Sequence, residues 1–82
     1  MSNISPKQCR SARALLDMTE EDLASHANVG LITIRSFESE QSVPTANSLR
    51  SIRLALERAG VEFLLGNVQG PGVSASKRKK EH

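Results

Sequence analysis

The chain has 82 residues, of which 38% are hydrophobic and 24% are charged, and it contains no Trp or Tyr. We expect these residues to form one domain with a modest aliphatic core. One cysteine cannot close an intramolecular disulfide, and no apolar run approaches the length of a membrane span. The first residues also lack the apolar segment of a secretory signal, so we expect a cytoplasmic protein without membrane association.

The formal net charge of +2 is concentrated near the C-terminus. Residues 77–82 contain four cations and one anion, which leaves residues 1–76 with seven cations and eight anions, a balance of −1. We expect residues 77–82 to form a disordered basic tail that either adds non-specific attraction to nucleic acid or only keeps the chain soluble. The body before it is not basic, which disfavours duplex DNA as a partner because affinity for DNA depends on neutralising phosphates.

Two helices are predicted in the first third of the chain, after an N-terminal arm of residues 1–5. Ser5 and the proline after it form a helix start, and apolar residues then recur at helical spacing. The first helix is therefore predicted from about Pro6 to Leu16. Thr19 is expected to cap a second helix, with Asp22 completing a capping box. The buried residues of that helix are predicted to be Leu23, Ala24 and Ala27.

A tight turn over Asn28–Gly30 is predicted to lead into a third helix from about Leu31 to Ser39. Asn suits a left-handed backbone at such a turn, and Gly30 interrupts the helical pattern. Within the third helix, Ile34 and Phe37 have the spacing of an inward pair. The residues that this orientation places on or near the outer face are Leu31, Ile32, Arg35, Ser36 and Ser39.

A fourth helix is predicted from about Ala46 to Ala59, ending at Gly60, which is typical of a helix C-terminus. Its inner stripe is predicted to be Leu49, Ile52, Arg53, Leu56 and Ala59. Residues 61–65 alternate in a way that indicates a strand. Residues 67–76 are expected to be a glycine-rich hairpin or loop, in which 73–75 could return as a second short strand.

Several short motifs follow one another in a recognisable order. They are Asp22-Leu23-Ala24, Ala27, Val29, Thr33-Ile34-Arg35, Phe37-Glu38, Pro44, Leu49 and Ile52. In order and spacing they resemble the Cro/CI, or XRE, family of bacterial helix-turn-helix domains. The resemblance covers about residues 6–60. It implies an all-α bundle of four to five helices over residues 6–66, with a short C-terminal strand or hairpin. It also implies that Glu38 is a buried structural carboxylate and that the third helix is offered to a DNA major groove.

The sequence departs from that family where DNA would be contacted. Base edges are read by hydrogen bonds, and the side chains of Leu31 and Ile32 have neither donor nor acceptor. Glu20 stands where the family commonly has a Gln that contacts a DNA phosphate. Together with Glu21 and Asp22, it fills the first turn of the second helix with carboxylates that would repel a phosphate.

We therefore hypothesise a transcriptional regulator that acts as an antiactivator by binding a transcriptional activator protein. Leu31 and Ile32 are predicted to be the anchors of this contact, and Arg35, Ser36 and Ser39 its rim. In this respect the chain is similar to the QseM-like antiactivators of rhizobial mobile elements. This resemblance implies that the chain acts on activator proteins rather than on DNA.

The alternative is a sequence-specific DNA-binding repressor of the same family. Its expected DNA contacts are Thr33, Arg35, Ser36 and Arg50. The strand over residues 61–65 also allows two interpretations, because it could cover the helical core or pair with a second copy to form a homodimer.

Catalysis, a cofactor and a metal site are not expected. Cys9 lies on the apolar side of the first helix and is predicted to be a small core residue rather than a nucleophile. His26 is predicted to face solvent, and the other histidine is at the chain end, so the pair lacks the spacing of metal ligands. No Ser-His-Asp arrangement is suggested, and we expect a protein that is not an enzyme.

Overall fold

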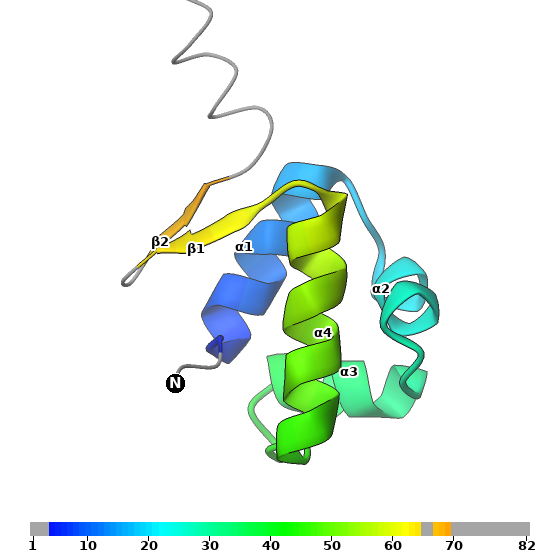
Figure 1. Ribbon diagram of the computed structural model, residues 1–82. Helices are drawn as coiled ribbons and strands as arrows, with labels where there is room; N and C mark the ends of the chain where they lie inside the picture. Colours follow the sequence, from blue (N-terminus) through cyan, green and yellow to red (C-terminus); the bar gives the residue numbers. More distant parts are fainter. Residues whose placement is uncertain (1–3, 65–66, 70–82) are drawn as a thin grey trace, which may run out of the picture.

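The computed structural model of this protein describes residues 4–64 and 67–69. These residues form the helices α1 (Pro6–Leu16), α2 (Glu20–Ala27), α3 (Leu31–Glu38) and α4 (Ala46–Ala59), and the strands β1 (Glu62–Leu64) and β2 (Asn67–Gln69). Figure 1 shows α4 beside α1 and α2, with the hairpin continuing from the end of α4 toward α1. The expectation of a mostly helical domain with a short C-terminal hairpin is confirmed.

Local sequence sets where α1 and α2 begin. The hydroxyl of Ser5 accepts a hydrogen bond from the backbone N–H of Gln8 at 3.1 Å, and the Gln8 side chain accepts one from the Ser5 N–H at 2.9 Å. Thr19 and Asp22 form the same reciprocal pair at distances of 3.0 and 3.1 Å. Both capping boxes satisfy backbone donors that have no partner within the helix, which is why these two starts could be predicted.

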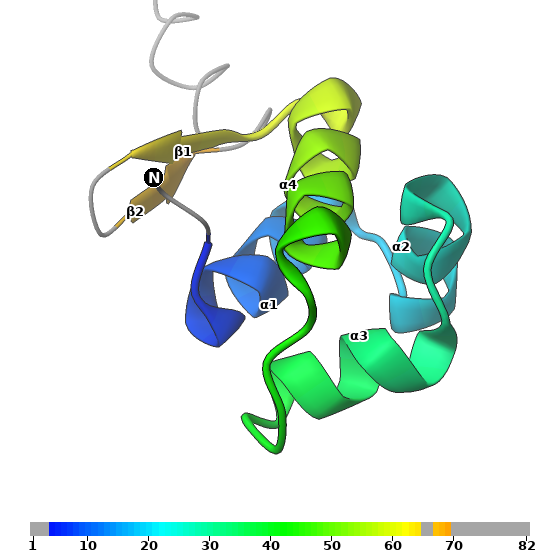
Figure 2. The same ribbon diagram turned by 60° about the horizontal axis from the view of Figure 1, so that its bottom comes forward.

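The first two helices end at residues with a left-handed backbone. Asp17 and Asn28 both have φ of 58°, a conformation that Asp and Asn tolerate better than most residues. After Asn28, the half-buried Val29 packs against the core, and α3 begins directly after Gly30. The predicted tight turn between α2 and α3 is therefore confirmed, and Figure 2 shows α3 running across the front of the molecule after it.

The core is mostly aliphatic, with one buried aromatic side chain among the described residues, Phe37, and it draws on every helix. Ile34 and Phe37 of α3 point inward as predicted, and Leu23, Ile34 and Ile52 have no exposed surface. The hydrophobic residues buried in the described part of the chain are Ile4, Cys9, Ala12, Leu23, Ala24, Ala27, Ile34, Phe37, Leu49, Ile52, Ala55, Leu56 and Val61.

Three expectations about core residues were wrong. Arg53 was assigned to the inner stripe of α4, but its side chain is 40% exposed and pairs with Glu57. Ile4 was assigned to an N-terminal arm, but it is buried in the core cluster directly before the cap of α1. Ala59 was assigned to the inner stripe of α4, but it is exposed, while Ala55 is buried one turn earlier. Val61, which lies between α4 and β1, is buried in the core. The apolar residue that packs inward at this end of α4 therefore belongs to the connection and not to the helix.

The C-terminal hairpin is tighter than expected. β1 and β2 are antiparallel, and Phe63 lies opposite Val68. Both side chains are partly buried and pack against the helical core, so the described hairpin covers the core. The returning strand is Asn67–Gln69, whereas the predicted return over 73–75 and the expected basic tail over 77–82 lie outside the described residues.

Among the described helices, none combines the length and the apolar character needed to cross a membrane.

Replacing Ile52 by Ala should lower the free energy of unfolding by about 3 kcal/mol, because deleting a fully buried branched side chain leaves a cavity. Leu54→Ala, two residues along the same helix, should cost less than about 1 kcal/mol because the Leu54 side chain is 38% exposed. Urea unfolding followed by circular dichroism measures both losses. Equal losses would contradict the orientation of α4.

Candidate interaction surface on α3

The outer face of α3 carries an exposed isoleucine. Ile32 is 70% exposed, although burial would be favourable for a side chain of this size. Arg35, Ser36 and Ser39 follow it at i+3, i+4 and i+7, which places them on the same side of the helix. Arg35 and Ser39 are exposed and Ser36 is half-buried. The structure therefore brings four of the five predicted partner-binding residues onto one face.

Leu31 does not belong to this face, and its prediction as an outward anchor was wrong. Its side chain is partly buried and packs against the core. Leu31 lies three residues before Ile34, so the two share a side of the helix, and Ile34 is completely buried. Ile32 points about 100° away from Leu31 around the helix axis, which leaves it as the apolar anchor of the outer face.

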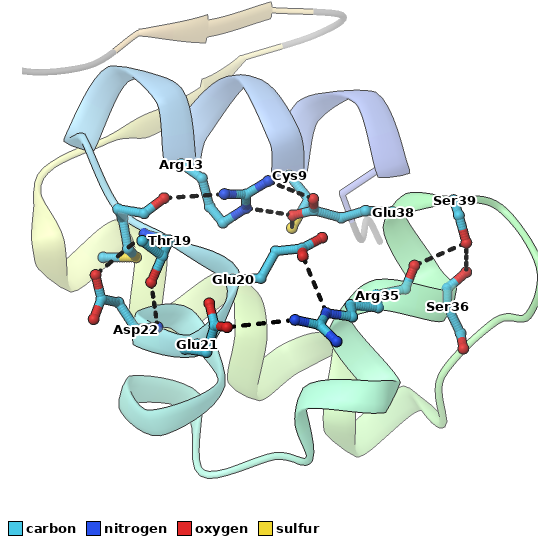
Figure 3. Close-up of polar contacts among 11 residues, drawn as sticks. Cys9, Arg13, Thr19, Glu20, Glu21, Asp22, Arg35, Ser36, Glu38 and Ser39 are labelled. Carbon is cyan, nitrogen blue, oxygen red and sulfur yellow. Dashed lines mark hydrogen bonds and ion pairs between the residues drawn. The ribbon is translucent and has the colours of Figure 1, made fainter.

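Arg35 is paired with two carboxylates from the first turn of α2. Its Nε lies 3.4 Å from Oε1 of Glu20, and its Nη2 lies 3.3 Å from Oε2 of Glu21. Figure 3 shows the guanidinium between the two acidic side chains. One cation and two carboxylates meet here, so this part of the surface has a formal charge of 1 − 2 = −1.

A third carboxylate stands in the same turn of α2. Asp22 is held by the capping box, and contacts with Thr19, chiefly with its backbone N–H, lower the pKa of Asp22. It is therefore ionised at neutral pH. Glu20, Glu21 and Asp22 complement the positive end of the α2 dipole, which would otherwise attract an anion.

The hydroxyl at the end of α3 is used within the chain. Oγ of Ser39 donates to the carbonyl oxygen of Arg35 at 2.8 Å and lies 3.3 Å from the carbonyl oxygen of Ser36 (Figure 3). Ser39 thus closes the last turn of α3. Its hydroxyl has less to offer a partner than its exposed position suggested.

A buried ion pair joins the last residue of α3 to α1. Glu38 is 4% exposed, and Arg13 donates to both of its carboxylate oxygens at 2.7 Å. The thiol of Cys9 donates to Oε2 of Glu38 at 3.1 Å, and Arg10 donates to the Glu38 carbonyl oxygen. Figure 3 shows Cys9, Arg13 and Glu38 together, above Glu20 and Arg35 in that view. The expected burial of Glu38 is confirmed, and its partners explain how a charge is tolerated there.

The electrostatics of this pair fix its protonation state. Burial alone would raise the pKa of Glu38, but hydrogen bonds from Arg13 and Cys9 outweigh it and lower that pKa. Burial also raises the pKa of the Cys9 thiol, and the hydrogen bond to Glu38 raises it further. Cys9 is therefore a protonated core residue that donates to a carboxylate, as its predicted place in the core allows.

Three of the four residues expected to contact DNA, Thr33, Arg35 and Ser36, lie on α3, and the fourth lies on α4. Thr33 is half-buried on α3, and Arg50 is exposed on α4. In the described part of the chain, no hydrogen bond or ion pair joins Arg50 to α3. Nor do the described residues contain three His, Cys, Asp or Glu side chains grouped as metal ligands.

Comparison with known proteins adds no family assignment. Searches of protein-family models and of curated proteins find no match to this chain. The Cro/CI resemblance of the sequence motifs remains a prediction, and function has to be inferred from the surface described above.

Replacing Glu38 by Gln should lower the free energy of unfolding by about 3 kcal/mol, because it leaves the largely buried Arg13 guanidinium without its counter-charge. Glu57→Gln is the control, since Glu57 pairs with Arg53 on the surface of α4 and such pairs contribute about 0.5 kcal/mol or less. Chemical unfolding of both variants at neutral pH gives the comparison. Similar losses would show that the Glu38 pair does not stabilise the fold.

The stability gap between wild type and Glu38→Gln should depend on pH. The folded-state pKa of Glu38 lies below its usual value of 4.5, so the ion pair contributes its full stability above pH 4.5. That contribution is lost as the pH falls through the folded-state pKa. Unfolding free energies measured from neutral to acidic pH should therefore converge for the two proteins below pH 4.5. A gap that stays constant would contradict the lowered pKa.

Proposed function

We propose that this protein is a transcriptional regulator of the helix-turn-helix type that acts as an antiactivator. It binds a transcriptional activator protein through the outer face of α3, with Ile32 as the anchor and Arg35, Ser36 and Ser39 around it. The observation that carries this proposal is the 70% exposure of Ile32 beside an arginine whose charge is already paired with two carboxylates.

The arrangement of α2 and α3 supports the helix-turn-helix assignment. Two helices of eight residues each are joined by a short turn over Asn28–Gly30 that contains a glycine. This is the local geometry in which such a motif presents its second helix to a partner. The inner side of α3 is anchored by Ile34 and Phe37, which leaves the opposite side available for contact.

The chemistry of that side favours a protein over DNA. Ile32 can gain free energy only by leaving water, and complete burial of such a side chain contributes about 1.5–3 kcal/mol. A recess on a protein surface offers this burial, whereas in a DNA groove it could meet little beyond a thymine methyl group. An apolar centre within a polar rim is also the general arrangement of a protein–protein interface.

The charge of the surface leads to the same conclusion. Arg35 is the cation that α3 offers, and Glu20 and Glu21 both lie within 3.4 Å of its guanidinium. A DNA phosphate approaching Arg35 would meet these carboxylates at close range, where salt screens charges poorly. Binding to duplex DNA would therefore begin against a local excess of negative charge.

Replacing Ile32 by Asp should abolish binding of the activator while leaving the fold intact. Ile32 is the second residue of α3, where a carboxylate complements the helix dipole, so the change places the new charge at a favourable position in the helix. Val43→Asp is the matched control. It makes the same kind of change at a residue that is 80% exposed in the loop after α3.

The three proteins are compared in a two-hybrid screen against a genomic library of the source organism, with circular dichroism to check helicity. A recovered activator is then tested with a reporter driven by its promoter. Wild type and Val43→Asp should bind the activator and reduce reporter output, and Ile32→Asp should do neither. Retained binding by helical Ile32→Asp would remove the proposal. A tight, sequence-dependent mobility shift of DNA upstream of the protein's own gene at physiological salt would instead support a DNA-binding repressor.

A further inference from the structure

We propose that Glu20 and Glu21 exclude nucleic acid from the face of α3 and thereby determine the class of macromolecule that this face binds. The inference rests on the proposed function, because it explains why a surface of this geometry takes a protein. Two residues of α2 would thus determine the binding specificity of a surface whose other residues come from α3.

Without these carboxylates, the junction of α2 and α3 would hold two phosphate-binding elements side by side. The first is the N-terminus of α2, whose unpaired backbone N–H groups and dipole favour an anion. The second is Arg35, whose guanidinium is about half exposed and lies against that same turn. A guanidinium is well suited to binding phosphate oxygens because its N–H groups form a planar fork.

The observed contacts use both elements within the chain: the Thr19–Asp22 capping box binds at the N-terminus of α2, and two carboxylates bind Arg35. Arg35 directs Nε to Glu20 and Nη2 to Glu21, at 3.4 and 3.3 Å. A phosphate could take these donors only by displacing both carboxylates, which would then remain beside it as uncompensated negative charges. Both ion pairs are long, and the side chains of Arg35 and Glu21 are mostly exposed while that of Glu20 is half-buried, so the two pairs contribute little to stability. Their main effect is on the charge that an approaching ligand meets.

The rest of the sequence gives this exclusion a purpose. Residues 77–80 are Lys, Arg, Lys and Lys, and a run of this kind attracts any nucleic acid without regard to sequence. Of the two interpretations of this run given above, the one in which it attracts nucleic acid would bring the whole chain close to DNA. An anionic cluster next to Ile32 keeps the outer face of α3 from joining that contact and leaves it open to a protein.

A purely structural role for the two residues makes a different prediction. If Glu20 and Glu21 only complement the α2 dipole and connect α2 to α3, their neutralisation would change the stability of the fold. The gain in DNA affinity would then be no larger than for any other variant with the same net charge. Glu57 and Glu62 provide that comparison, because both are acidic side chains outside α2 and α3. Replacing either pair by Gln changes the net charge equally and nearly preserves side-chain shape.

The test measures binding of a fluorescein-labelled DNA duplex of random sequence by fluorescence anisotropy, at salt concentrations from about 50 to about 150 mM. The proteins are the full-length wild type, E20Q/E21Q, E57Q/E62Q and E20Q/E21Q/R35A. We expect E20Q/E21Q to bind several-fold more tightly than E57Q/E62Q at low salt. Its plot of log affinity against log salt should be steeper by about one, the value for one more neutralised phosphate. Adding R35A should remove the gain.

Equal affinity and equal salt dependence for E20Q/E21Q and E57Q/E62Q would overturn the inference. So would a gain that persists in the R35A variant. Circular dichroism melts check that each variant is folded, and the single variant E21Q, which changes a mostly exposed side chain, must shift in the same direction. Failure of the proposed function is recognised separately, because it is judged on whether the wild-type protein binds an activator through Ile32.

Discussion

The buried carboxylate of Glu38 is the constraint on which the presented surface depends. A charge in the core is tolerated only when its oxygens are fully engaged, and here Arg13 and Cys9 of α1 supply the donors. Because the partners come from another helix, α3 cannot rotate about its axis without breaking these bonds. The same orientation directs Ile34 inward and Ile32 outward. The face of α3 that is exposed to solvent is therefore determined inside the molecule.

The interior pair and the surface cluster are coupled through Glu20. On the surface, Glu20 pairs with Arg35, and Figure 3 shows its side chain between Arg35 and the pair formed by Arg13 and Glu38. The pKa of Arg13 is raised first by its hydrogen bond to Glu38 and also by the charge of Glu20. Arg13 and Arg35 thus each interact with more than one carboxylate, so the positive charge of both is balanced by neighbouring acidic groups.

Features that depend on a few neighbouring residues could be predicted from the sequence. The capping box of Thr19 and Asp22, the left-handed Asn28 and the inward pair in α3 all follow from local spacing and from backbone preferences. Features that depend on which elements meet could not. The contact between Cys9 and Glu38 spans 29 residues, and the pairing of Arg35 with Glu20 requires the packing of α3 against the start of α2. Leu31 was misplaced for the same reason, since its burial depends on the core beneath α3.

The physical difference between a helix that reads DNA and one that binds protein can rest on very few side chains. The backbone of α2, the turn and α3 would suit either task, since both need a short helix held with one face outward. The two kinds of partner differ in the chemical properties that they require of that face. Base readout needs free hydrogen-bonding groups and uncompensated positive charge, whereas a protein contact needs apolar area that gains from desolvation. The function proposed above rests on the second set, since Ile32 is exposed and Arg35 is already paired to acidic neighbours. In general, a binding surface selects among partners by unfavourable encounters as much as by favourable ones, which is the role proposed here for Glu20 and Glu21.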